Sequence, residues 1–274
     1  MAALKKRKTN LISVVIPAYK AQNIIEETIL RVKDILEQIR YPYELICVVD
    51  GTSDDNSYEI AKKIARKYPN IKVYGYKINY GKGNAVRYGF SKAKGEILGF
   101  IDSGLDINPN GLSMLLEHFE WYNADIIVGS KRHPVSKVVY PRERRIISFG
   151  YQVIVRVLFG LNIKDTQVGM KFFRKEVIKK ILPRLLVKEF AFDIEMLSVA
   201  NYLGFKKIYE APVELINMKF TGKVSTIISK GFIRTIWRTL WDTMAVFYRL
   251  KILKYYDDKN KSKWITPDYL TKEN

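Results

Sequence analysis

Short apolar runs alternate with helical patterns along the first half of the chain, and this alternation constrains the fold more than any other feature. Residues 11–17, 45–49 and 71–76 are rich in branched apolar side chains, and residues 97–101 form a fourth run of this kind. Between the runs, apolar residues recur at the spacing of helices. Continuous apolar strands joined by helices are typical of a mostly parallel sheet covered on both faces. The sequence therefore predicts an α/β fold.

The predicted helices lie between and after these strands. Helical spacing recurs in four segments, which are residues 24–39, 56–67, 84–93 and 225–251. Asn23 is expected to cap the first helix, and another helix is expected to start near Pro109. A further strand ends at Gly129, and a basic loop is expected over residues 131–145. The last helix is basic and aromatic, unlike the others.

The charge of the chain predicts anionic partners. Lys and Arg outnumber Asp and Glu by 47 to 28, a net charge of +19, which suits nucleotide phosphates, nucleic acid or an acidic lipid surface. No nucleic-acid recognition motif accompanies this charge, so we expect no nucleic-acid partner. The single cysteine, Cys47, lies in an apolar run and fits a reducing compartment. No apolar stretch approaches the roughly 18 residues of a membrane-spanning helix.

Two carboxylates flank a glycine where the fourth strand ends. Asp102 directly follows the apolar run, and Asp106 lies four residues later, beyond Gly104. Carboxylates at the carboxyl end of a parallel strand suit a Mg²⁺ or Mn²⁺ ion that is shared with substrate phosphates. Taken alone, the pattern favours a capped turn before the next helix over a metal site. The pair is the candidate metal site.

Four further clusters carry polar groups at expected strand ends or helix starts. Asp50 can accept hydrogen bonds from a ribose or a base, or it can close a turn. Lys82 lies between two glycines whose exposed backbone N–H groups suit a phosphate. The basic run at residues 131–133 either clamps a diphosphate or is solvated. Asp193 is either a helix cap or a partly desolvated general base.

Seven clusters follow one another in register. They are Pro17-Ala18-Tyr19, Asp50-Gly51-Thr52, Asn79-Tyr80-Gly81-Lys82-Gly83, Asp102-Ser103-Gly104, Gly129-Ser130-Lys131-Arg132-His133, Asp165-Thr166-Gln167-Val168-Gly169 and Phe192-Asp193-Ile194-Glu195. In order and spacing they resemble the family 2 glycosyltransferases, above all the dolichyl-phosphate glucose and mannose synthases and related polyprenyl-phosphate transferases. The resemblance extends over about residues 11–215. It implies a GT-A fold, a nucleotide-sugar donor, a divalent cation and transfer with inversion.

The resemblance also assigns roles to residues. The implied donor contacts are Pro17, Ala18, Tyr19, Asp50, Gly51, Lys82, Gly83, Asp102 and Ser103. Asp102 becomes the leading metal ligand, with Asp106 as a second, and Asp193 or Glu195 lies on the acceptor side. With Asp102, these two acids are the catalytic candidates. The candidates for binding the diphosphate or the acceptor are Lys131, Arg132, His133, Gln167, Arg142 and Arg145, with Arg144 and Arg156 nearby.

Two positions depart from the family pattern. The family usually has two acids in its second-strand motif, whereas this chain has Val49 before Asp50. The family's metal motif is usually Asp-X-Asp, whereas Gly104 occupies the second acidic position here. Either Asp106 substitutes, or Asp102 and the donor diphosphate hold the metal with water. Two classes of function remain: an active transferase, and a catalytically weak partner protein that binds a nucleotide sugar.

The C-terminal part of the chain bears on the acceptor. Residues 222–274 combine large aromatic side chains with a basic stripe, typical of an interfacial helix on an anionic bilayer. The alternative is packing on the rest of the chain or on a second subunit. A polyprenyl phosphate is already ionised and needs no base, whereas a glycan hydroxyl needs one such as Asp193.

The expected organisation is therefore a basic tail (1–10), a GT-A domain (11–221) and an amphipathic segment with a tail (222–274). We expect the chain to act in the cytoplasm, peripherally at the cytoplasmic face of a membrane. It would move a hexose from a donor of the UDP-glucose or GDP-mannose type to a polyprenyl phosphate or, alternatively, to a glycan or glycolipid hydroxyl.

Overall fold

The structure is a computed structural model that describes residues 10–136, 142–189, 191–216 and 230–264. Its centre is a seven-stranded sheet with the strand order β3-β2-β1-β4-β6-β5-β7. The strands are β1 (Ile12–Ala18), β2 (Tyr43–Asp50), β3 (Ile71–Tyr76), β4 (Ile97–Ile101), β5 (Ile126–Ser130), β6 (Met170–Arg174) and β7 (Ile208–Pro212). All run in one direction except β6. The predicted α/β fold with a mostly parallel sheet is confirmed.

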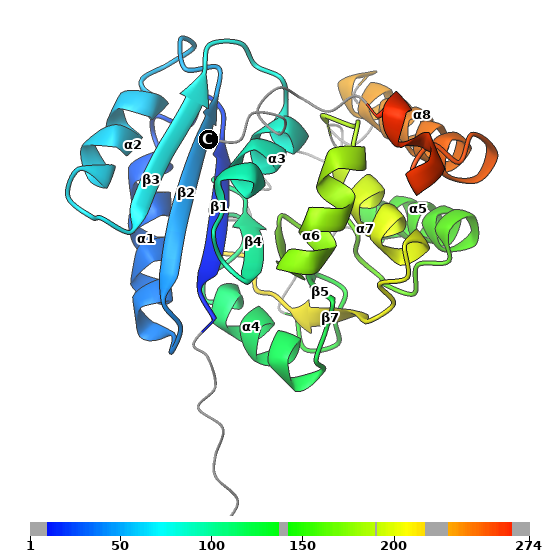
Figure 1. The fold of residues 1–274 in the computed structure, drawn as a ribbon, viewed down its shortest axis with the longest axis horizontal. Helices are drawn as coiled ribbons and strands as arrows, with labels where there is room; N and C mark the ends of the chain where they lie inside the picture. Colours follow the sequence, from blue (N-terminus) through cyan, green and yellow to red (C-terminus); the bar gives the residue numbers. More distant parts are fainter. Residues whose placement is uncertain (1–9, 137–141, 190, 217–229, 265–274) are drawn as a thin grey trace, which may run out of the picture.

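Helices cover both faces of this sheet (Figure 1). One layer contains α1 (Ile25–Gln38), α2 (Ser57–Ala65) and α4 (Gly111–Trp121). The other contains α3 (Lys82–Lys92), α5 (Arg142–Phe159), α6 (Lys175–Ile181), α7 (Phe192–Tyr202) and α8 (Lys230–Phe247). Alternate strand residues point into the two layers, so that Val14 and Ile16 lie in the first core and Val15 lies in the second. Burial on both faces explains why the strands are continuously apolar.

Strand β6 differs from its neighbours in direction and composition. It pairs antiparallel with both β4 and β5, and Lys171 at its middle stands opposite Phe100 and Val128. A lysine is thereby placed inside the sheet, where it is 0% exposed. A buried ammonium requires a partner, so this strand leads directly to the candidate site.

Three predicted helix boundaries are wrong. The residue before α1 is Ile24, and no side chain of the described residues caps this helix, so Asn23 is not the cap. Helix α3 starts at Lys82, two residues early, because Gly81 with its φ of 96° ends the preceding turn there. Helix α5 starts at Arg142, inside the predicted loop, because arginine and glutamate favour helices and extend the apolar pattern that follows.

The C-terminal helix packs into the second layer. Helix α8 contacts α5 and α7, and the hydroxyls of Tyr151 and Thr243 are 2.8 Å apart. Val246, Leu250 and Tyr256 are buried members of the core. The remaining described elements are the short helices η1 (Leu182–Arg184), η3 (Tyr248–Ile252) and η4 (Asp258–Lys263). Residues 225–229 of the predicted helix lie outside the described residues.

No described helix is both long enough and apolar enough to cross a bilayer.

Candidate active site

Four charged side chains form a continuous chain at the carboxyl ends of the central strands. The Lys82 ammonium lies 2.7 Å from Oδ1 of Asp102 and 3.8 Å from Oδ2 of Asp193. Lys171 donates a 2.5 Å hydrogen bond to Oδ1 of Asp193. The structure therefore brings together three predicted site residues, Lys82, Asp102 and Asp193, and adds Lys171. We call these four residues the charge chain.

The position of Asp102 depends on a glycine in the neighbouring strand segment. Its backbone N–H donates a 2.9 Å hydrogen bond to the carbonyl of Gly169, immediately before β6. A Cβ at Gly169 would lie 1.9 Å from Oδ2 of Asp102, which is impossible. Gly169 is thus required for the Asp102 carboxylate to lie where it does.

Lys171 is the member of the charge chain that the sequence analysis missed. Its ammonium also donates a 2.5 Å hydrogen bond to the carbonyl of Val168. Burial lowers the pKa of Lys171, while the Asp193 carboxylate opposes this effect. The available signal was a lysine inside the apolar run Met170-Lys171-Phe172-Phe173. Asp193, predicted as a possible helix cap, is instead the second residue of α7.

Lys82 is held as a cation. Burial alone would lower its pKa, but the charges of Asp102 and Asp193 outweigh burial and raise the pKa above its ordinary value. The ammonium groups of Lys82 and Lys171 each lie 5.2 Å from the centre of the Phe100 ring. The aromatic ring favours both cations and excludes water from their apolar side.

The glycine loop around Lys82 differs from its predicted role. Both oxygens of Asp50 accept 2.7 Å hydrogen bonds from this loop, from the N–H groups of Tyr80 and Gly81. The N–H of Gly83 donates to the carbonyl of Lys188 at 2.8 Å. The interpretation that the two glycine N–H groups are exposed for a phosphate is therefore wrong, since the fold already uses them. The lysine side chain is the group that the loop presents.

The other predicted donor contacts lie near the ends of β1, β2 and β4. Pro17 and Ala18 belong to β1 and are buried, while the Tyr19 side chain beyond them is 43% exposed. Gly51 has a φ of 82°, and a Cβ there would lie 3.4 Å from the Tyr19 ring. The carbonyl of Ser103 accepts a 2.6 Å hydrogen bond from the Thr28 hydroxyl of α1. These residues line the same edge as the charge chain.

The carboxylates present fit a divalent cation that a ligand completes. Burial, and then the charge of Asp102, raise the pKa of Asp106, so the two acids act on each other. Among the described residues, the neighbour of Oδ1 of Asp102 is the Lys82 ammonium at 2.7 Å, and the Asp102 side chain is 45% exposed. No group of three or more His, Cys, Asp or Glu side chains in the described ranges could hold a metal alone. Such a set suits Mg²⁺ or Mn²⁺ shared with phosphate oxygens.

The basic run after β5 is anchored at its backbone. The N–H of Lys131 donates to Asp165 at 3.2 Å. The Arg132 guanidinium bonds Gln152 of α5, and its second terminal nitrogen is buried without a partner among the described residues. Gln167 is exposed on the segment before β6. Arg132 therefore has hydrogen-bonding capacity left for an anion.

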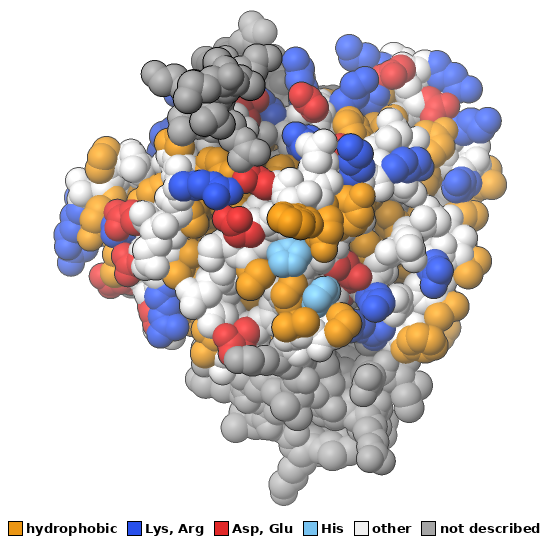
Figure 2. All heavy atoms as spheres, turned by 90° about the horizontal axis from the view of Figure 1, so that it is seen from below, with side chains coloured by type: hydrophobic (Ala, Val, Ile, Leu, Met, Phe, Trp, Pro, Cys, Tyr) orange, Lys and Arg blue, Asp and Glu red, His pale blue; other side chains and the backbone are white. Residues whose placement is uncertain are grey.

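His133 lies apart from the charge chain. The chain has two histidines, and they lie next to each other among apolar side chains on the face shown in Figure 2. Burial lowers the pKa of His133 below its ordinary value, the Glu210 carboxylate opposes this shift, and His118 adds to it. The role of His133 in binding the diphosphate or the acceptor stays a prediction.

One other predicted site residue is not brought to the charge chain, and two more have side chains outside the described part of the structure. Glu195 is 0% exposed, and its carboxylate accepts hydrogen bonds from Leu186, Val187 and Tyr256. Arg142 and Arg145 lie in the first turns of α5, but their side chains are outside the described part of the structure, as is that of Arg144. Arg156, further along this helix, is exposed.

The chain is similar to several proteins named as dolichyl- or dolichol-phosphate sugar transferases. The chain is 30% identical over 206 residues to the dolichyl-phosphate beta-glucosyltransferase of Dictyostelium discoideum, covering 70% of this chain and 63% of that protein. It is 30% identical over 266 residues to a dolichyl-phosphate beta-glucosyltransferase of Trichomonas vaginalis, covering 91% and 77%. It is 30% identical over 239 residues to the dolichol-phosphate mannosyltransferase of Pyrococcus furiosus, covering 79% and 66%. The match thus spans less than two thirds of the Dictyostelium protein.

Solved structures share the fold at lower identity. Glucosyl-3-phosphoglycerate synthase from Mycobacterium tuberculosis, in complex with Mn²⁺, UDP and glucosyl-3-phosphoglycerate, superposes with a TM-score of 0.60 at 19% identity, covering 85% of this chain and 79% of that one. Mannosyl-3-phosphoglycerate synthase from Rubrobacter xylanophilus superposes with a TM-score of 0.63 at 15% identity, covering 91% and 77%. These similarities establish the GT-A fold.

The family description "Glycosyl transferase family 2" matches residues 13–182, from the start of β1 to the end of α6. This range contains Lys82, Asp102 and Lys171 of the charge chain, whereas Asp193 follows it. Because the match covers more than half of the sequence, the chain belongs to glycosyl transferase family 2.

Proposed function

We propose that the protein transfers a hexose from a nucleotide-diphosphate sugar to a polyprenyl phosphate of the dolichyl type, with inversion, at a membrane surface. The observation that carries this proposal is the charge chain, in which Asp193 already has an ammonium group on each side. Family membership and the dolichyl-phosphate transferases among the relatives support the reaction class.

On the donor side, the proposal uses the edge between β1, β2 and β4. Tyr19, Asp50 and Gly51 would form the nucleotide end of the site, and Lys82 would face the diphosphate. Asp102 and Asp106 would hold Mg²⁺ or Mn²⁺, which would neutralise charge on the diphosphate. The M. tuberculosis synthase of the same fold contains Mn²⁺ and UDP, which supports a divalent cation here. Arg132 offers a further cation for phosphate oxygens.

On the acceptor side, the surroundings of Asp193 favour a phosphate. Asp193 is only 4% exposed, and its carboxylate lies between the ammonium groups of Lys171 at 2.5 Å and Lys82 at 3.8 Å, so little of it is open to a substrate hydroxyl. A general base must reach the proton that it removes. A phosphate monoester is ionised near neutral pH and needs no base. The alternative, a glycan or glycolipid hydroxyl as acceptor, requires the buried Asp193 carboxylate to become accessible to that hydroxyl.

The proposed step is a single displacement. An oxygen of the acceptor phosphate attacks the anomeric carbon and forms the new bond, while the bond from that carbon to the diphosphate oxygen breaks. The electron pair leaves with the nucleoside diphosphate, and the configuration at carbon inverts. As a cation, Lys82 would stabilise the departing negative charge, and no proton transfer would be needed.

Exposed apolar side chains on two neighbouring helices support action at a membrane. They are Phe149, Val153, Ile154 and Val157 on α5, Trp237, Trp241 and Met244 on α8, and Tyr248 just after it. Residues 149, 153 and 157, like 237 and 241, recur every four positions and so share a helix face. Arg156 and Arg238 beside them are exposed. Aromatic side chains with basic neighbours suit an anionic bilayer, and a second subunit is the alternative occupant.

The donor nucleotide is the finer part of the proposal. Glucosyltransferases dominate the relatives, which favours UDP-glucose. The P. furiosus mannosyltransferase keeps GDP-mannose as the alternative. The buried, unpaired Cys47 fits the cytoplasmic face of the membrane. The departures from the family pattern at Val49 and Gly104 leave another class of function open, a catalytically weak partner protein that binds a nucleotide sugar.

The test is sugar transfer by the full chain in vesicles that contain polyprenyl phosphate. UDP-glucose and GDP-mannose are supplied in parallel, each with Mn²⁺, with Mg²⁺ and with chelator. We expect a lipid-extractable product from one donor, formed only with metal and only with the phosphorylated lipid. Transfer to polyprenol or to a glycolipid instead would establish the alternative acceptor. Nucleotide binding without transfer to any acceptor would support the partner-protein option and contradict the proposal.

Membrane binding has its own matched comparison. Trp241 on α8 and Trp121 on α4 are 77% and 86% exposed, but they belong to opposite helix layers. Trp241→Glu should reduce sedimentation with anionic vesicles, whereas Trp121→Glu should not. Equal losses in both variants would contradict the assigned surface, and a change of oligomeric state in Trp241→Glu would favour the second subunit.

A further inference from the structure

Glu195 is a buried carboxylate that the proposed chemistry does not use. It is 0% exposed and accepts hydrogen bonds from the N–H groups of Leu186 at 3.0 Å and Val187 at 2.8 Å, and from the Tyr256 hydroxyl at 2.7 Å. A guanidinium nitrogen of Arg249 lies 3.8 Å from Oε1. Burial raises the pKa of Glu195, and the hydrogen bonds oppose this effect. Because burial of a carboxylate is costly, these bonds fix the backbone at residues 186–187.

The backbone fixed by Glu195 leads directly to the loop that carries Lys82. The carbonyl of Lys188 accepts a 2.8 Å hydrogen bond from the N–H of Gly83. A Cβ at Gly81 would lie 2.6 Å from this carbonyl oxygen, and a Cβ at Gly83 would lie 2.9 Å from it. The two segments are therefore in backbone contact with no side chain between them. A displacement of Lys188 must move both glycines, and Lys82 lies between them.

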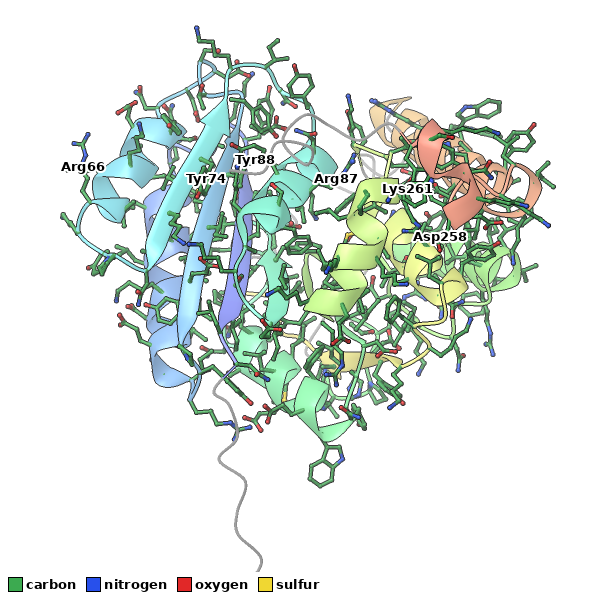
Figure 3. All side chains as sticks on the ribbon, in the orientation of Figure 1. Arg66, Tyr74, Arg87, Tyr88, Asp258 and Lys261 are labelled. Atoms are coloured by element: carbon green, nitrogen blue, oxygen red, sulfur yellow. The ribbon has the colours of Figure 1, made fainter. Side chains whose placement is uncertain are left out.

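The C-terminal segment, residues 248–264, contains Tyr256, which bonds Glu195 through its hydroxyl and is itself held by Arg184. The carbonyl of Tyr256 accepts a 2.9 Å hydrogen bond from Nε of Arg184, and the same guanidinium bonds the carboxylate of Asp258. In Figure 3 the labelled Asp258 lies on this segment beside the helices of the second layer. The Arg184 guanidinium also lies 4.1 Å from the centre of a Trp264 ring. Tyr256 is thereby immobilised from its backbone side.

We infer that Tyr256 and Glu195 are positioning residues, which hold the backbone at residues 186–188 and thereby set the position of Lys82. The C-terminal segment is then part of the construction of the donor site, although it contributes no group to the charge chain. The inference rests on the proposed function only for what Lys82 binds. The connection from Tyr256 through Glu195 and Lys188 to Gly83 rests on the contacts described above and does not depend on the proposed function.

The primary test is hydrogen exchange of the full chain without ligand, comparing Tyr256→Phe with Tyr202→Phe. The Tyr202 hydroxyl bonds Asp257 at 2.7 Å, so the control removes a hydroxyl contact to the same segment without touching Glu195. We expect amide exchange within residues 79–85 to rise about fivefold in Tyr256→Phe, the factor associated with one hydrogen bond. Exchange there should stay unchanged in Tyr202→Phe. Unchanged exchange in Tyr256→Phe, or an equal rise in both variants, would overturn the inference.

A binding measurement separates this inference from the proposed function. UDP and GDP are titrated with Mn²⁺ into wild type and both variants, and Tyr256→Phe should bind the preferred nucleotide about fivefold more weakly. Equal affinity in wild type and Tyr256→Phe would refute the positioning role. If wild type binds neither nucleotide, the proposed function fails, while the exchange comparison still decides the link. Glu195→Gln keeps the side-chain shape, should give the same pattern, and replaces Tyr256→Phe if that variant does not fold.

Discussion

Two lysine–carboxylate pairs lie at opposite edges of one sheet, and their surroundings differ. At the amino edge, Glu44 accepts hydrogen bonds from the Ser13 hydroxyl at 2.7 Å, the Lys94 N–H at 2.6 Å and the Lys72 ammonium at 2.6 Å. At the carboxyl edge, the corresponding pair is Asp102 with Lys82. The Asp102 side chain is 45% exposed there, whereas that of Glu44 is 6% exposed.

The difference separates a structural carboxylate from one that can serve a ligand. Burial raises the pKa of Glu44, but the bonds from Lys72, Lys94 and Ser13 outweigh burial and lower the pKa below its ordinary value. The fold's own donors therefore satisfy Glu44, which leaves little capacity for a ligand. Asp102 is held by another side chain that can itself exchange partners. The same two residue types thus stabilise the fold at one edge and provide a binding site at the other.

The largest effect is expected for Asp102→Asn, which removes the leading carboxylate of the candidate metal site. Catalytic efficiency should fall by about 10²- to 10³-fold, the usual cost of losing one electrostatic contact to a transition state. The melting temperature should change little, because no backbone donor depends on this carboxylate. Sugar transfer and thermal unfolding are the two measurements. Full activity in Asp102→Asn would contradict the assigned role.

Replacing Lys82 and Lys72 by methionine, one at a time, tests the same comparison through the lysine of each pair. Lys82→Met should lower catalytic efficiency by about 10²-fold, since it removes a charge that faces the departing diphosphate. Lys72→Met, the matched control at the amino edge, should leave catalysis by the folded protein unchanged. Steady-state kinetics with both variants provides the measurement. Equal losses would mean that the two edges do not differ as described.

Glu44→Gln should affect stability and spare the site. We expect a loss of about 1.5 to 3 kcal/mol in the free energy of unfolding, the range for hydrogen bonds to charged groups, measured by urea denaturation. Because the folded pKa of Glu44 is lowered, this contribution is complete above the ordinary value of 4.5 and disappears as pH falls through the folded pKa. Metal-dependent nucleotide binding should be retained. An unchanged unfolding free energy at pH 7 would contradict the structural role.

Asp106→Asn should give the smallest effect. The pKa of Asp106 is raised in the folded state from its ordinary value of 3.8, so its ionisation opposes folding at higher pH. The variant should melt slightly above wild type at pH 7, and the difference should vanish below the ordinary pKa. Affinity for Mn²⁺ in the presence of nucleotide should fall. A variant less stable than wild type at pH 7 would contradict the raised pKa.

Local sequence patterns carried most of the fold and part of the site. Strands β1 to β4 follow from apolar runs, and Asp102 and Lys82 follow from polar groups at strand ends. The antiparallel direction of β6 was not predictable, because its sequence does not specify its partners. Lys171 was missed for the same reason, since its partner Asp193 lies on a distant helix.

The glycine loop shows a different limit of sequence reasoning. Gly81 and Gly83 predicted exposed N–H groups, yet both groups are used by Asp50 and Lys188. From the sequence alone, glycines that expose backbone N–H groups to a phosphate cannot be distinguished from glycines that allow two segments to pack closely. Glu195 was likewise expected at the acceptor side, because nothing local indicates its contact with Tyr256, far along the chain.

The central claim is that the carboxyl edge binds a nucleoside diphosphate together with a metal ion, and isothermal calorimetry tests it most directly. UDP and GDP would be titrated into wild type, Asp102→Asn and Glu44→Gln, each with Mn²⁺ and with chelator. We predict that wild type and Glu44→Gln bind one nucleotide only when Mn²⁺ is present, and that Asp102→Asn binds neither. Binding by Asp102→Asn equal to wild type, or no binding by wild type under any condition, would contradict the claim.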